Sequence, residues 1–122
     1  MMRECLHCGM PAQVPRLQLE DLPPSRICLK CDSDLYSQSD ASVLTRDIAH
    51  QQESVKQALA KLENCLIAAW EGHARSLRLV VGGGLIRQDV LGQLEYLQNL
   101  GVVLEYSEDR PNRGAILVRI RA

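Results

Sequence analysis

Four cysteines near the amino terminus have a spacing that is typical of metal binding. Cys5 and Cys8 form one Cys-x-x-Cys pair, Cys28 and Cys31 form a second, and 19 residues separate the two pairs. This spacing fits a tetrahedral site of four thiolates, so we expect one structural Zn²⁺ ion. The alternatives are unrelated core cysteines or two disulfides, and a reducing compartment disfavours the disulfides. A redox pair would need a strand-to-helix step, which neither pair shows. His7 could replace a cysteine as ligand, although a solvent-facing position is the simpler interpretation.

The segment around these cysteines has few large apolar residues, so it cannot build a core of its own. Zinc binding in such peptides contributes about 10–16 kcal/mol, enough to replace the missing core. The segment resembles the zinc finger of the DksA/TraR family. Only four residues precede Cys5, whereas a long coiled coil precedes the finger in DksA, so we do not expect a role in regulating polymerase. The resemblance rests on Cys5-x-x-Cys8-Gly9, Arg16-Leu17, Pro24 and Ile27-Cys28-x-x-Cys31.

A run of three glycines is the second feature that could bind a ligand. Gly82, Gly83 and Gly84 stand between an expected strand and an expected helix that carries Arg87 in its first turn. Backbone N–H groups in such a loop, together with the positive end of the helix dipole, can hold a phosphate. A sharp turn that needs positive φ angles is the competing interpretation. The loop fits neither the P-loop nor the dinucleotide-binding fingerprint, so nucleoside triphosphates and NAD are not expected ligands.

Other polar residues could assist at this loop. Arg110 and Arg113 lie in a turn-rich segment before the last expected strand, and arginine suits bidentate phosphate contacts. Asp47 and His50 follow an earlier strand and could bind a metal or act as acid and base. The alternative is that they are an ordinary loop histidine and an aspartate before a helix.

The hydrophobic pattern predicts the elements that must position these residues. We expect an α+β fold with a small N-terminal zinc finger over residues 1–33, a polar linker over 34–42 and an α/β domain over 43–122. Within that domain the pattern predicts a two-layer β-α-β-α-β-β sandwich, in which both helices pack on one mixed sheet. The expected strands cover 43–48, 76–81, 102–106 and 115–120, and the expected helices cover about 53–70 and 87–100.

Three blocks of the α/β part form a recognisable set: Asp47-Ile48-Ala49-His50, Leu77 to Arg87 with Gly82-Gly83-Gly84, and Arg113-Gly114-Ala115-Ile116-Leu117-Val118. With these blocks the α/β part resembles the Smr (small MutS-related) domain, whose fold has this order of elements. That resemblance implies nucleic-acid binding and, as in several members, endonuclease activity. Two departures bear on the chemistry: Val81 replaces the histidine that the family places before its glycine loop, and His50 stands three residues after Asp47 instead of two.

The composition of the chain excludes several functional classes of protein. The formal net charge is −1, with 14 basic and 15 acidic residues, which excludes a strongly basic protein that coats nucleic acid. Aromatic residues make up 3% of the chain, so a recognition sheet of stacked aromatics is not expected. No apolar run is long enough to span a membrane, and we expect a cytoplasmic protein of bacterial type.

The sequence therefore predicts a nucleic-acid-binding protein, with RNA or branched DNA as the expected partner. Gly82, Gly83, Gly84 and Arg87 would contact phosphates, assisted by Arg110 and Arg113. Two alternatives stay open. One is a weak endonuclease that uses Asp47 and His50. The other is an adaptor that binds a protein partner through its zinc finger and has a degenerate Smr-like domain.

Overall fold

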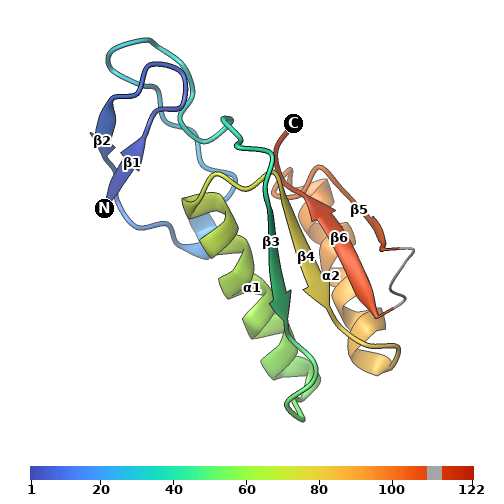
Figure 1. Ribbon diagram of the computed structural model, residues 1–122. Coiled ribbons are helices and arrows are strands. Elements are labelled where there is room, and N and C mark those ends of the chain that lie inside the picture. The colour runs from blue at the N-terminus through green and yellow to red at the C-terminus, as the bar shows by residue number, and fades with distance from the viewer. Residues whose placement is uncertain (110–113) are drawn as a thin grey trace.

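The computed structural model describes residues 1–109 and 114–122 and shows two parts that pack against each other (Figure 1). The first part is a small cysteine-bearing unit, and the second is a four-stranded sheet with two helices. In chain order the elements are β1 (Met2–Glu4), β2 (Pro11–Gln13), a short 3-10 helix (Leu19–Asp21), β3 (Val43–Asp47), α1 (Val55–Glu71), β4 (Ser76–Val80), α2 (Leu85–Asn99), β5 (Glu105–Glu108) and β6 (Ala115–Arg119).

The larger sheet is mixed, as the pattern predicts. Its strand order is β3-β4-β6-β5, with β3 and β4 parallel and with both other pairings antiparallel. Helix α1 connects the two parallel strands, and Figure 1 shows α1 and α2 behind the same face of the sheet. The expected α+β class, the order of these six elements and the final antiparallel hairpin are confirmed. The small antiparallel sheet of β1 and β2 was not expected, because strands of three residues leave little periodic signal.

Helix α1 begins where its sequence offers a strong cap. The Ser54 side chain accepts a hydrogen bond from the Gln57 backbone, and the Gln57 side chain accepts one from the Ser54 backbone. This capping box satisfies two N–H groups that a helix start would otherwise leave unpaired. The apolar stripe of α1 packs toward the sheet and includes the buried Ala58, Leu62, Leu66, Ala69 and Trp70.

One strand lies later in the chain than predicted. The apolar run at residues 102–106 predicts a strand there, but β5 covers Glu105–Glu108. Val102 and Val103 are buried as a connector instead, and both donate backbone hydrogen bonds to Leu97 near the end of α2. Gly101, with φ of +81°, turns the chain into this position. The two valines thus donate hydrogen bonds to a carbonyl at the end of α2 and fill the core. Their burial gives the apolar sequence pattern of a strand, although they do not pair with another strand.

Two buried arginines join the cysteine-bearing unit to the rest of the molecule. Arg3 on β1 donates hydrogen bonds from Nη1 to the carbonyls of Glu71 (2.7 Å) and Gly72 (2.8 Å). Arg121 donates to the carbonyls of Ala69 (3.1 Å), Trp70 (2.7 Å) and Ala74 (2.5 Å). The unpaired carbonyls at a helix end carry partial negative charge, so both guanidinium groups are stabilised there.

The same junction is closed by residues of the segment predicted as a linker. Leu35 and Tyr36 are almost fully buried, and their carbonyls accept hydrogen bonds from Arg3 and Arg121, respectively. One apolar cluster runs from Cys5, Val14 and Cys28 into the sheet. We call residues 1–38 the cysteine unit from here on. Among the residues described, no helix is long and apolar enough to cross a membrane.

Candidate functional site

The fold brings the four predicted cysteine ligands together. The sulfur atoms of Cys5, Cys8, Cys28 and Cys31 all lie within 4.8 Å of one another. The Cys5–Cys31 and Cys8–Cys28 sulfur pairs are 3.6 Å and 3.7 Å apart, and all four thiols are free. These separations match the edge of a tetrahedron with four sulfur atoms at about 2.3 Å from a central ion, which is about 3.8 Å. The group can therefore hold a metal ion.

Hydrogen bonds favour the thiolate at Cys5 and Cys28, whose pKa values are lowered. Despite a hydrogen bond from the Met10 backbone, burial and the neighbouring cysteines raise the pKa of Cys8 to about 11. Burial raises the pKa of the Cys5 thiol, but the backbone N–H groups of Cys8 and His7 and the side chain of Gln38 outweigh it and lower that pKa to about 6. The Gln38 amide nitrogen lies 3.2 Å from the Cys5 sulfur. The sequence carries no signal for this role of Gln38, because it stands in a polar, serine-rich stretch.

A second group of residues gathers at the opposite end of the sheet. Parallel pairing sets Asp47, the last residue of β3, beside Val80, the last residue of β4. The loops that follow two adjacent parallel strands leave the sheet at the same edge. The loop with His50 and the glycine loop Gly82–Gly84 are therefore neighbours, although about 30 residues separate them in the chain.

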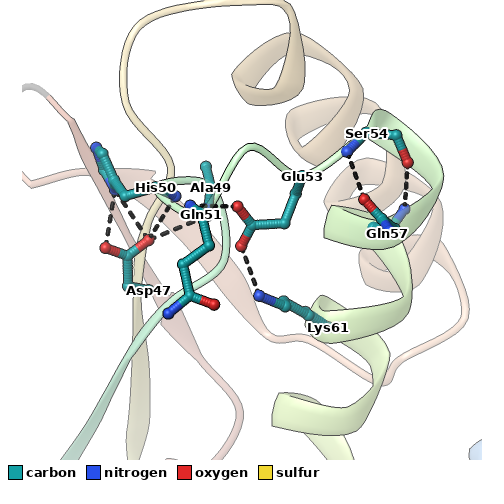
Figure 2. A network of polar contacts seen from close by, with 8 residues as sticks. All are labelled: Asp47, Ala49, His50, Gln51, Glu53, Ser54, Gln57 and Lys61. Carbon is teal, nitrogen blue, oxygen red and sulfur yellow. Dashed lines mark hydrogen bonds and ion pairs between the residues drawn. The ribbon is translucent and has the colours of Figure 1, made fainter.

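Asp47 and His50 form a carboxylate–imidazole pair (Figure 2). Nδ1 of His50 lies 2.8 Å and 2.9 Å from the two carboxylate oxygens of Asp47. The same carboxylate accepts the backbone N–H groups of Ala49 (3.0 Å) and His50 (3.2 Å). Partial burial raises the pKa of Asp47, but the hydrogen bonds from Ala49 and His50 outweigh it and hold that pKa below its usual range. The aspartate is thus an anion that fixes the imidazole ring.

The other ring nitrogen of His50 lies next to the glycine loop. A β-carbon added to Gly82, which has a φ of +68°, would lie 3.7 Å from Nε2 of His50. The amides of Val81 and Gly82 bond to the Gly114 carbonyl, whereas no described residue accepts a hydrogen bond from the amides of Gly83 and Gly84. An added β-carbon at either of these two glycines would meet nothing within 4 Å. The described residues thus leave open space on the side-chain side of both glycines.

Of the three arginines predicted to contact phosphates, the structure describes one. Arg87 lies in the first turn of α2, but its guanidinium pairs with Glu108 of β5 and is only 13% exposed. Its Nη1 is buried without a hydrogen-bond partner among the residues that the structure describes. Arg110 and Arg113 lie outside the described residues.

The chain after His50 is held by local contacts that Figure 2 also shows. Glu53 accepts a 2.5 Å hydrogen bond from the Gln51 backbone and pairs with Lys61 on α1 at 2.6 Å. The Glu53 side chain is only 4% exposed. These contacts tie the loop with His50 to the first two turns of α1.

Comparison with known proteins gives no further assignment. No protein-family model, no curated protein and no solved structure matches this chain.

Proposed function

We propose that the cysteine unit holds one Zn²⁺ ion as a structural centre. The clustering of the four sulfur atoms within 4.8 Å, the 3.6 Å and 3.7 Å spacing of two pairs and the lowered pKa of Cys5 support this choice. Elemental analysis of the purified chain should find about one zinc per chain. A Cys31→Ser variant should lose most of that zinc, whereas Cys65→Ser on α1 should keep it. Equal zinc content in both variants would contradict the proposal.

The function that the geometry supports best is binding of a nucleic-acid phosphate at the glycine loop. The observation that carries it is that three polar groups lie along the same loop. The amides of Gly83 and Gly84, which have no acceptor among the described residues, stand at the start of α2, and Nε2 of His50 lies beside Gly82. N–H groups at a helix start bind anions, and an imidazole adds a further donor when protonated.

The resemblance to the Smr domain supports the same ligand class. In that family a histidine precedes the glycine loop, and here Val81 takes its place and is buried. We infer that His50 supplies the imidazole from the neighbouring strand end instead. RNA and branched DNA are the ligands we expect, as in the sequence analysis.

A negative charge placed in the glycine loop tests this proposal, and the same charge placed on α2 is the matched control. Gly83→Asp puts a carboxylate beside the two amides, in a place where an added β-carbon meets no other atom. Gly92→Asp adds the same charge on the exposed part of α2, where the space is equally open.

Fluorescence anisotropy with structured RNA, single-stranded DNA and branched DNA should show binding that weakens as salt rises. We expect Gly83→Asp to weaken binding about tenfold or more, and Gly92→Asp to leave it nearly unchanged. No binding at low salt, or equal effects of both changes, would contradict the proposal.

Cleavage of a phosphodiester is the second candidate function, because Asp47 orients His50 with its free nitrogen toward the loop. In this mechanism Nε2 of His50 takes a proton from the attacking hydroxyl or water. The new oxygen–phosphorus bond forms as the bond to the leaving oxygen breaks. The leaving oxygen takes a proton from water, and His50 later releases its proton to the solvent. The amides of Gly83 and Gly84 would stabilise the charge that develops on the phosphate.

Binding and cleavage can be separated by one substitution. Asp47→Asn keeps the shape of the side chain but removes the anion that fixes the ring. We expect it to lower cleavage about a hundredfold or more with binding retained, because general acid–base catalysis contributes about 10²–10⁴-fold. Unchanged cleavage in this variant would assign the activity to a contaminating nuclease.

A further inference from the structure

The cysteine unit carries an open apolar cavity that the proposed nucleic-acid site does not use. It lies between β2 and the extended segment 26–28, has a volume of about 490 Å³, and has Leu35 among its lining residues. Such a volume is within the range of sites that accept small ligands and peptide side chains, about 300–1,000 Å³. The side chains around it are unusually exposed for their type: Met10 is 44% exposed, Ile27 50% and Leu29 100%.

Both walls of this cavity present backbone groups that have no partner among the described residues. Met1 and Val14 exchange two hydrogen bonds, so the next pair along the small sheet, Met2 and Gln13, is a non-hydrogen-bonded pair. The N–H and C=O of Gln13 therefore point away from β1. On the other wall, Ile27 bridges Asp34, and the hydrogen bonds of this bridge come from the residues on either side of Ile27. Its own N–H and C=O likewise point away from the partner segment.

The charged side chains at the rim of the cavity are all positive. Arg26 and Lys30 line the cavity, and its lining holds no acidic residue. Both side chains are exposed, and neither forms an ion pair with a residue that the structure describes. An occupant with acidic side chains would complement this rim.

We propose that this cavity binds an extended peptide segment of a partner protein, in which acidic and apolar side chains are mixed. The segment adds as a strand between β2 and Ile27, so that its backbone pairs with the exposed N–H and C=O groups. Its apolar side chains cover Met10 and Leu29, and its acidic side chains face Arg26 and Lys30. This inference does not depend on nucleic-acid binding, because the glycine loop lies at the other end of α1 (Figure 1).

A selection from random peptides displayed on phage, carried out on the metal-loaded full chain, tests this proposal. The selected peptides should mix acidic with apolar residues. Synthetic copies should bind about tenfold more weakly to Leu29→Ser, because burial of an exposed leucine contributes affinity of this order. Leu6→Ser is the matched control, since Leu6 is 43% exposed on the cysteine unit but does not line the cavity.

Two further variants test the backbone and charge contacts. Gln13→Pro removes the outward N–H without removing a hydrogen bond to β1, and Lys30→Glu reverses one rim charge. Both should weaken peptide binding, and zinc content reports whether each variant is folded. If Gln13→Pro loses zinc, N-methylation of alternate peptide amides tests backbone pairing instead and should abolish binding. The proposal is overturned if no peptide is selected, or if the selected peptides bind equally to the wild type and to Leu29→Ser. It is also overturned if Lys30→Glu weakens nucleic-acid binding and leaves peptide binding unchanged.

Discussion

Arg3 shows how one buried side chain joins two parts of the molecule. Its side chain reaches three backbone carbonyls, and its guanidinium lies 4.5 Å from the centre of the Tyr36 ring. Burial lowers the pKa of Arg3. A planar guanidinium can donate in several directions at once, whereas the ammonium of lysine is a compact point charge.

We therefore expect Arg3→Lys to destabilise the protein. The change leaves two buried carbonyls without their donors, so the free energy of unfolding should fall by about 2–4 kcal/mol. Arg16→Lys is the control, because the Arg16 side chain is 78% exposed and contacts Glu71 only at 3.5 Å. That change should stay within about 0.5 kcal/mol. Urea unfolding of the metal-loaded variants measures both values, and similar losses in the two would contradict this view of Arg3.

At the scale of single elements, the loop before α1 combines a helix cap with a partly buried ion pair. The ion pair with Lys61 is the main cause that lowers the pKa of Glu53. A carboxylate whose pKa is lower in the folded than in the unfolded state stabilises the fold at neutral pH. This stabilisation is lost as the pH falls below the usual glutamate value and through the lower folded value.

The lowered pKa of Glu53 predicts how the stability of a Glu53→Gln variant depends on pH. The variant should melt at a lower temperature than the wild type at neutral pH, and the difference should shrink as the pH falls below the usual glutamate range, because the wild-type carboxylate then becomes protonated too. Glu20→Gln, at an exposed position of the short 3-10 helix, should show little difference at any pH. Thermal melts followed by circular dichroism measure the three proteins. A constant difference between Glu53→Gln and the wild type across this range would contradict the assigned role.

For the whole molecule, the four-cysteine cluster and the end of α1 form one continuous structure. Cys5 lies two residues after Arg3, and Arg3 contacts the last turn of α1. Removal of the proposed Zn²⁺ ion should therefore unfold more than the cysteine unit, because structural zinc contributes about 10–16 kcal/mol to such units.

Hydrogen exchange before and after removal of the metal by a chelator tests this coupling. Residues 1–38 and the last turn of α1 should exchange faster after removal, whereas β4 and the body of α2 should keep their protection. Uniform loss of protection would show that the sheet also depends on the metal. Unchanged exchange at Glu71 and Gly72 would show that the Arg3 contacts survive without it.

The sequence predicts those features that depend on local pattern. The Cys-x-x-Cys pairs predict the sulfur cluster, and the apolar stripes of α1 and α2 predict the helices that pack on the sheet. The contact between His50 and Gly82 depends on which strands pair, and no local pattern in the chain reports that. The buried arginines are missed for another reason, since arginine usually marks the surface. Val102 and Val103 are misassigned because burial and strand pairing give the same apolar signal.

The length of α1 has a consequence for how two ligands could share the protein. Its 17 residues span about 25 Å at about 1.5 Å per residue, with the cysteine unit at one end and the glycine loop at the other. That distance is about three times the Debye length of about 8 Å at physiological ionic strength. An acidic peptide on the cysteine unit would thus not repel a phosphate at the glycine loop. The chain would act as a rigid tether that raises the effective concentration of its partner near a bound nucleic acid.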